Sequence, residues 1–240
     1  MKNMKIMSLM NNHLIQEGYF KYVYTGSNND KLILSFKDTL PFMKNSSMLW
    51  NLMNAHMFNL LHSCNIPNHF IKMSNLKEHE VYNTSPFPFH IRMTNIITQP
   101  VPSVFKLEKG TVLKKPLFEF ITKEKGVIKP IELGYLKMFD WCVEHHFDQI
   151  KQIAHRVNDI LRSFFFHFGA DIAHVILLFG LFDPEYTFAA KDMGKIIVID
   201  DLTPNSFALW HKNENRLLEM EESTINSLAS YMKINTNSLS

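Results

Sequence analysis

An apolar run of about 11 residues, Ile172 to Phe182, is the feature that most limits how this chain can fold. It lies between Asp171 and Asp183, and His174 is its single polar side chain. A helix that spans a bilayer needs about 20 apolar residues, so this run is too short to cross a membrane. A continuous apolar run of this length is instead typical of a strand that is buried on both faces of a sheet.

Patterning in the rest of the chain predicts both strands and helices. Aromatic and branched residues over Tyr19–Thr25 and Lys31–Phe36, separated by G-S-N-N-D, predict a β-hairpin. Apolar residues at helical spacing predict one helix over Ser47–Cys64 and a long one over roughly Leu136–Phe168. A second buried strand is predicted at Lys195–Asp200, and a helix with a loose tail in the last 25 or so residues. The mixture predicts an α+β protein.

Two features of the middle of the chain predict interruptions. Prolines at 86, 88, 100 and 102 bracket the segment I-R-M-T-N-I-I-T, which predicts that any strand there is short or lies at a sheet edge. The charged segment K-E-K-G-V-I-K-P at 123–130 is interpreted as a connector between two parts of the chain.

Composition narrows the classes of function. The chain has 240 residues, of which 46% are hydrophobic and 20% charged, enough to bury a sizeable core. Its net charge of +2 comes from dispersed lysines and arginines, so the sequence predicts no nucleic-acid partner. Two cysteines without zinc-site spacing, and an N-terminus without a long apolar segment, predict a cytoplasmic protein with no membrane association.

Three groups of residues are candidates for chemistry. Asp200 and Asp201 close a predicted buried strand, where carboxylates can face a cleft and bind metal, or can instead cap the following turn. Lys21, close to Gly18, could bind phosphate, and a plain surface hairpin is the alternative. The histidines at 145, 146 and 155 match no metal-site spacing, which favours solvated or partly packed positions on a helix.

Five segments, read together, resemble the SAICAR synthetase family over residues from about 15 to 216. The family's E-G-K-A-K-x-V-Y and F-K-D are matched by E-G-Y-F-K-Y-V-Y at 17–24 and by the end of L-I-L-S-F-K-D at 32–38. G-I-P-T-H-F-I is matched by N-I-P-N-H-F-I at 65–71. The remaining two are E-K-G-T-V-L-K-K-P-L-F-E-F-I-T-K at 108–123 and I-I-V-I-D-D-L-T-P-N-S-F-A-L-W at 196–210.

The resemblance implies a two-domain α+β fold. A small antiparallel-sheet domain that covers the nucleotide would occupy residues 1–85, and a larger ATP-grasp-like domain, with a long helix and buried strands, would occupy 86–240. The implied reaction is an ATP- and Mg²⁺-dependent ligation, in purine biosynthesis, of aspartate to a carboxyaminoimidazole ribotide. The implied roles are nucleotide phosphate for Lys21 and Lys123, Mg²⁺ for Asp201, and substrate for Arg92 and Asn95. No catalytic residue is assigned.

Departures from the family pattern fall in the apolar run and in the segment at 196–210. His174, Ile176 and Leu178 stand where the family has Asp, Lys and Glu, and Ala208 stands where it has Arg. Mg²⁺ takes oxygen ligands, which a leucine cannot supply. The sequence therefore predicts impaired ligase activity, with a binding or interaction protein on the same fold as the alternative. The predicted partners are a nucleotide or ribotide, and homo-oligomerisation is left open.

Overall fold

The structure is a computed structural model that describes residues 12–99, 103–124, 127–183 and 194–235. Its strands form two sheets, one of five strands and one of seven, and all strand pairs in both sheets are antiparallel. The mixed α+β class predicted from the sequence is confirmed.

The five-stranded sheet is built from the first third of the chain in the order β1-β2-β3-β5-β4. The predicted hairpin is present as β2 and β3, and the predicted helix as α1, which packs against β3, β4 and β5. The elements are β1 (Leu14–Glu17), β2 (Lys21–Thr25), β3 (Lys31–Phe36), α1 (Ser46–Ser63), β4 (Phe70–Met73) and β5 (Glu78–Tyr82).

The seven-stranded sheet has the order β12-β11-β9-β6-β7-β8, and β10 pairs with β9. The apolar run is confirmed as a central strand, because β9 pairs with β6 on one side and with β10 and β11 on the other. The strands are β6 (Ser85–Ile96), β7 (Val112–Glu124), β8 (Val127–Pro130), β9 (Ala170–Phe182), β10 (Lys195–Ile199), β11 (Phe207–His211) and β12 (Arg216–Leu217), with a 3-10 turn η1 (Ser103–Phe105).

Two expectations about the middle of the chain were wrong. Residues 91–96 of the proline-bracketed segment belong to the 12-residue strand β6, which lies between β9 and β7 at the centre of the sheet. Pro86 and Pro88 are tolerated because the pairing with β9 is irregular between Pro86 and His90, and regular pairing with β7 begins only at His90. Segment 123–130 is not a domain connector, since β7 and β8 pair across it as a hairpin.

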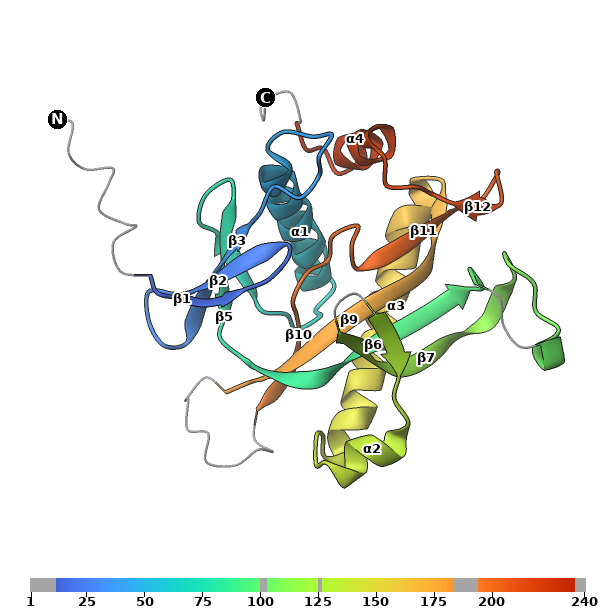
Figure 1. Cartoon of the computed structure of the whole chain (residues 1–240), viewed down its shortest axis with the longest axis horizontal. Helices are drawn as coiled ribbons and strands as arrows, with labels where there is room; N and C mark the ends of the chain where they lie inside the picture. The colour runs from blue at the N-terminus through green and yellow to red at the C-terminus, as the bar shows by residue number, and fades with distance from the viewer. Residues whose placement is uncertain (1–11, 100–102, 125–126, 184–193, 236–240) are drawn as a thin grey trace.

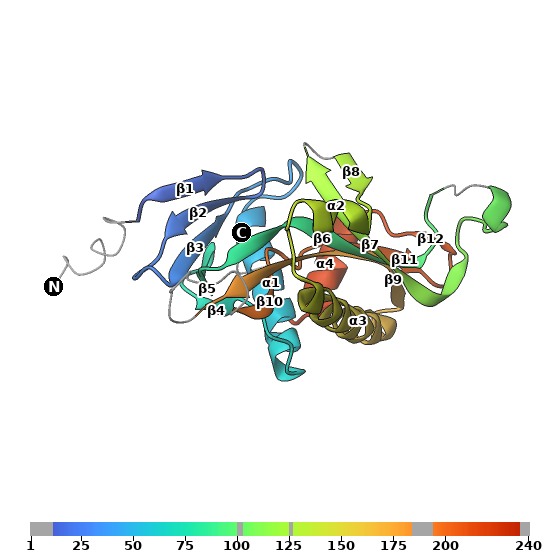
Figure 2. The ribbon, with the colours of Figure 1, turned by 90° about the horizontal axis from the view of Figure 1, so that it is seen from below.

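The long predicted helix is divided into α2 (Leu133–Met138) and α3 (Glu144–His167). Asp140 has a φ of 48°, a left-handed conformation that ends a helix. The buried residues of α3 recur every three or four positions and form the stripe expected of an amphipathic helix: Ile150, Ala154, Val157, Leu161 and Phe165. The terminal helix is α4 (Glu222–Tyr231), and Figure 2 shows α1, α3 and α4 on the same side of the two sheets.

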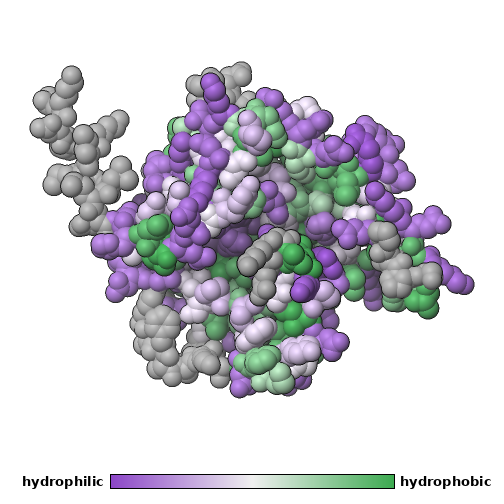
Figure 3. Space-filling model, viewed as in Figure 1, coloured by the Kyte–Doolittle hydropathy of each residue, from purple (hydrophilic) through white to green (hydrophobic). Residues whose placement is uncertain are grey.

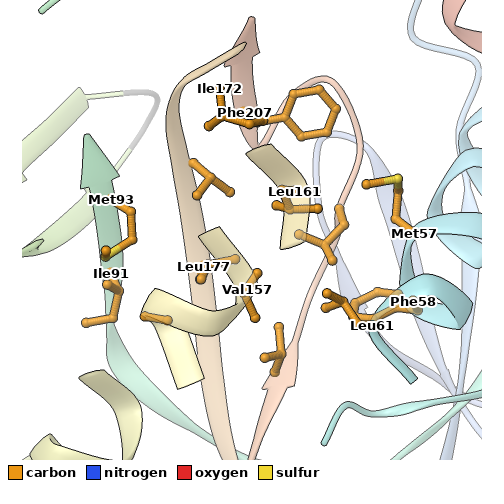
Figure 4. Close-up of a cluster of buried hydrophobic side chains, with 14 of the residues drawn as sticks. Met57, Phe58, Leu61, Ile91, Met93, Val157, Leu161, Ile172, Leu177 and Phe207 are labelled. Carbon is orange, nitrogen blue, oxygen red and sulfur yellow. The ribbon is translucent and has the colours of Figure 1, made fainter. Parts of the chain in front are cut away.

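One large hydrophobic core includes side chains from both sheets, and a second, small cluster is formed by Ile96, Ala173 and Trp210. Met57 and Phe58 of α1, Leu161 of α3 and Leu177 of β9 belong to one cluster of buried side chains (Figure 4). Full burial of an aliphatic or aromatic side chain of this kind contributes about 1.5–3 kcal/mol. The first sheet ends at Tyr82 and the second begins at Ser85, while a domain division at residue 85 stays a prediction.

Hydrophilic residues cover most of the face of the molecule seen in Figure 3, with apolar residues gathered in separate patches. None of the helices in the described residues is both long enough and apolar enough to cross a membrane.

Candidate functional site

A lysine from the first sheet meets two carboxylates from the second. Lys21 is the first residue of β2, and its Nζ donates hydrogen bonds to Oδ1 of Asp200 and Oδ1 of Asp201, the two residues that follow β10. The exposed fraction of the side chain is 15% for Lys21, 40% for Asp200 and 11% for Asp201. The contact therefore lies at the junction of the two sheets and is partly open to solvent.

The backbone of Asp200 explains how two consecutive carboxylates reach one ammonium group. Successive side chains of an extended strand point to opposite faces. Asp200 has a φ of 74°, in the left-handed region, and this breaks the alternation directly after β10. A non-glycine residue in such a conformation costs on the order of 1–3 kcal/mol, so the surrounding structure must hold it there.

Charge and burial together set the protonation of the cluster. Burial alone would lower the pKa of Lys21, but the two carboxylates reverse the effect and raise this pKa above its ordinary value. Burial alone would raise the pKa of Asp200, and Lys21 instead lowers it. Burial raises the pKa of Asp201 to about 6; Lys21 opposes the rise and Asp200 adds to it. At neutral pH the three groups carry one net negative charge, which suits them to a further cation.

Two buried histidines, His69 and His79, adjoin this cluster. Burial, with a smaller effect from Lys21, lowers the pKa of His69 to about 3. Burial also lowers the pKa of His79 well below its ordinary value, and His69 and Lys21 add to the effect. Nδ1 of His79 lies 2.7 Å from Oδ1 of Asn51, whose Nδ2 donates to two backbone carbonyl groups. Both imidazoles are therefore neutral at pH 7 and add no charge to the site.

The second sheet contributes His90 from β6 and Lys123 from β7. Burial lowers the pKa of His90, Asp200 opposes this, and Lys123 adds to it. Lys123 also lowers the pKa of Asp201 by its charge, so it lies within electrostatic range of that carboxylate, and its side chain is exposed. The structure therefore places Lys21 in contact with Asp201, and Lys123 within electrostatic range of that carboxylate.

The face of the second sheet that points away from α3 carries a nearly uncharged row of side chains. Arg92 of β6 pairs across the sheet with Ile176 of β9 and donates from Nε to Oε2 of Glu119 at 2.9 Å. His174 and Leu178 lie two residues before and two residues after Ile176 in β9, so their side chains point to the same face of the sheet as that of Ile176. Burial lowers the pKa of His174, and Arg92 adds to this effect. The row thus presents one ion pair, one neutral imidazole and two apolar groups.

Asn95, predicted to bind substrate together with Arg92, lies on the other face of β6. Its side chain is 1% exposed and exchanges two hydrogen bonds with Asn158 of α3, at 2.8 and 3.0 Å. Both side-chain polar atoms are used inside the core, because a buried amide without partners would destabilise the fold. The structure therefore does not bring Asn95 together with the other predicted site residues.

The two carboxylates at the junction of the sheets suit a hard cation such as Mg²⁺. The described residues contain no group of three or more His, Cys, Asp or Glu side chains arranged to hold a metal. Mg²⁺, however, is commonly bound by only one or two carboxylates, and substrate phosphates and water complete its coordination. Asp200 and Asp201 supply that number of carboxylates.

Sequence reasoning missed three histidines and assigned only one of the two aspartates. His69, in I-P-N-H-F-I, and His90, in F-P-F-H, stand inside apolar stretches, where a polar side chain is a sign of a buried contact. His79 lies in the charged stretch E-H-E and gives no such sign. Asp200 and Asp201 were recognised together as a strand end, but their shared orientation depends on a backbone torsion that the sequence does not reveal.

A separate hollow lies away from this site. It has a volume of about 210 Å³ between the end of α3 and the start of α4, and its lining includes Phe168, His211, Ser223 and Ser227. None of the ionisable residues that surround Lys21 lines it.

Comparison with known proteins identifies the family. The sequence profile of SAICAR synthetase matches residues 14–225. The chain is 29% identical over 212 residues to "Phosphoribosylaminoimidazole-succinocarboxamide synthase 1" of Mesorhizobium japonicum, a match that covers 84% of this chain and 78% of the relative. It is 26% identical over 216 residues to the synthase of Sphingopyxis alaskensis, covering 86% and 81%.

Solved structures agree with this fold. The synthase from Ehrlichia chaffeensis superposes with a TM-score of 0.80 at 21% identity, covering 93% of this chain and 99% of that one. A type-2 SAICAR synthetase in complex with ADP superposes with a TM-score of 0.72 at 23% identity, covering 91% and 94%. The SAICAR synthase of Saccharomyces cerevisiae, complexed with SAICAR, gives 0.67 at 15%, covering 95% and 85%. This chain belongs to the SAICAR synthetase family, which acts in purine biosynthesis.

Proposed function

We propose that this protein binds ATP with Mg²⁺ at the junction of its two sheets and is an amide-forming ligase of the SAICAR synthetase type. The observation that carries the proposal is the contact of Lys21 with Asp200 and Asp201. A solved relative holds ADP, which supports a nucleotide as the ligand of this junction.

The residues at the junction have distinct roles in this proposal. Lys21 and Lys123 bind phosphate oxygens through their ammonium groups, because a charge-assisted hydrogen bond is stronger than a neutral one. Asp201 holds the Mg²⁺, with Asp200 as a second carboxylate. When bound, Mg²⁺ neutralises phosphate charge and so favours phosphoryl transfer. Lys21 contacts both carboxylates, so a cation bound by them would compete with Lys21 and free its ammonium group for the phosphates.

The face of the second sheet that carries Arg92, His174, Ile176 and Leu178 offers little free charge to anionic substrates, and this supports slow ligation. The carboxyaminoimidazole ribotide and aspartate are both anionic, and Arg92, the cation in the row, is already paired with Glu119. Ile176 and Leu178 offer these substrates no charge. An arginine contact to phosphate contributes roughly 1.5–3 kcal/mol, so an arginine held by another partner lowers affinity by about tenfold or more. The same neutrality favours the second candidate function, a binding or interaction protein that retains the nucleotide site.

One assay separates the two functions. Purified protein is given ATP, Mg²⁺, aspartate and the carboxyaminoimidazole ribotide, and the release of ADP is followed. We expect turnover that depends on aspartate and is well below the enzyme median of about 10 s⁻¹. Turnover within about a hundredfold of that median would exclude the interaction-only function. ATP binding without aspartate-dependent turnover would exclude the ligase and leave the binding protein.

A further inference from the structure

The turn at residues 200–202, which carries both aspartates, is anchored on each side by the first half of the chain. Before the turn, the backbone N–H of Val198 donates to the carbonyl of Pro67 at 3.0 Å. After it, the backbone N–H of Leu202 donates to Oδ1 of Asn54, a residue of α1, at 2.7 Å. The first anchor joins two backbone groups, whereas the second depends on a side chain.

The hydrogen bond between Leu202 and Asn54 bears directly on Asp201. A peptide group is planar, so the N–H of Leu202 lies in one plane with Cα of Asp201. Holding that N–H therefore fixes the plane from which the side chain of Asp201 projects toward Nζ of Lys21. Asn54 is fully buried on α1, and α1 packs against the sheet that carries Lys21. The first part of the chain thus positions both the ammonium group and the carboxylate that it contacts.

Stability alone does not account for an asparagine at position 54. Its Oδ1 accepts from Leu202, while its Nδ2 is buried and has no hydrogen-bond partner among the described residues. A leucine here would leave the N–H of Leu202 unpaired in place of Nδ2, and a buried donor without a partner is destabilising in either case. What asparagine adds is an acceptor that holds the peptide group after Asp201.

We propose that Asn54 is a positioning residue, which holds the carboxylate of Asp201 in place for Mg²⁺ by accepting the hydrogen bond from the backbone of Leu202. Without this acceptor the turn is anchored only on the side of Val198, and the carboxylate of Asp201 loses its fixed position beside Asp200. Asn54 touches neither nucleotide nor metal in this account. The identity of the ligand rests on the proposed function, whereas the effect on the backbone does not.

The backbone effect is tested without any ligand, by NMR hydrogen exchange in the full-length chain. The amide of Leu202 is compared with that of Val198, whose backbone acceptor is unchanged, in the wild type and Asn54→Leu. We expect exchange at Leu202 to accelerate at least about tenfold relative to Val198, because only Leu202 loses its acceptor. Equal acceleration at both amides, or none at Leu202, would overturn the proposal.

Two further variants support the exchange measurement. Asn158→Leu makes the same change at another fully buried asparagine, on α3, and should leave the ratio of the two exchange rates at its wild-type value. If Asn54→Leu does not fold, Asn54→Ala takes its place, since alanine also removes the acceptor and adds no bulk. The same tenfold change in the ratio is expected, and an unchanged ratio would again overturn the proposal.

The functional effect is tested by calorimetry with two probes, Mg·ATP and ATP with excess chelator. Asn54→Leu should weaken Mg·ATP binding by about tenfold and metal-free ATP binding by less than about threefold, since the latter depends on the lysines. Asn158→Leu should weaken neither, although it removes two hydrogen bonds from the core. Equal weakening of both probes in Asn54→Leu would assign Asn54 a purely structural role and overturn the proposal. If the wild type binds neither probe, the proposed function fails, and the exchange measurement alone decides the role of Asn54.

Discussion

Replacing His69 with asparagine is expected to make folding less sensitive to acid. The imidazole is 4% exposed and its pKa is lowered from 6.5 to about 3, so it must stay neutral in the folded protein, whereas it gains a proton in the unfolded chain below pH 6.5. A depressed pKa contributes stability that is fully present above pH 6.5 and is lost as the pH falls toward 3. The loss is about 1.36 kcal/mol for each pH unit, or about 2 kcal/mol at pH 5.

Asparagine keeps a polar side chain at this position but does not titrate, so the variant removes only the protonation. Asp201 acts in the opposite sense, because its raised pKa makes folding less favourable as the pH rises from about 4 to about 6. That contribution is common to both proteins and cancels in their difference.

The free energy of unfolding is measured by urea denaturation at about pH 7.5 and about pH 5. Between these values His69→Asn should lose about 2 kcal/mol less than the wild type does. His62→Asn removes an exposed histidine near the end of α1 and is the matched control, in which the wild-type loss should persist. An equal acid loss in the wild type and His69→Asn would refute the reasoning that His69 is buried in its neutral form.

Three further outcomes follow from the structure. Asn95→Ala should reduce the free energy of unfolding by about 1–3 kcal/mol in urea, because Asn158 loses its partners. The same variant should leave Mg·ATP affinity unchanged in calorimetry; a loss of affinity would indicate that Asn95 contributes to ligand binding. Phe165→Ala should cost about 3–5 kcal/mol of stability by the same urea assay, since its side chain is 0% exposed in the core; a cost below 1 kcal/mol would contradict that packing. Glu119→Gln should release Arg92 and strengthen binding of ribose 5-phosphate by about tenfold in calorimetry; unchanged affinity would show that the ion pair does not limit anion binding.

Much of the fold could be predicted because burial patterns are local. The apolar run that became β9, the β2–β3 hairpin and helix α1 were each apparent in the spacing of their side chains. The predictions that failed concern features that depend on residues distant in the chain. β6 is central despite its prolines, since an irregular register with β9 accommodates them, and this register depends on a strand about 90 residues away in the chain.

The candidate site was predicted only in part. Lys21, Lys123 and Asp201 were selected through motif resemblance; Lys21 contacts Asp201, and Lys123 lies within electrostatic range of it. Asn95 was misplaced because a residue's face on a strand depends on register, and β6 turns Asn95 toward α3. The shared orientation of Asp200 and Asp201 depends on the left-handed backbone of Asp200, a tertiary feature with no local signature.

The central claim, a Mg·ATP site that depends on Lys21, is tested most directly by titrating Mg·ATP into the wild type and Lys21→Met. Lys44→Met, which removes an exposed lysine just before α1, serves as the control. Loss of charge-assisted contacts worth about 1.5–3 kcal/mol predicts affinity at least about tenfold weaker in Lys21→Met and unchanged in Lys44→Met. Equal affinity in the wild type and a folded Lys21→Met variant, or no binding by the wild type, would contradict the account.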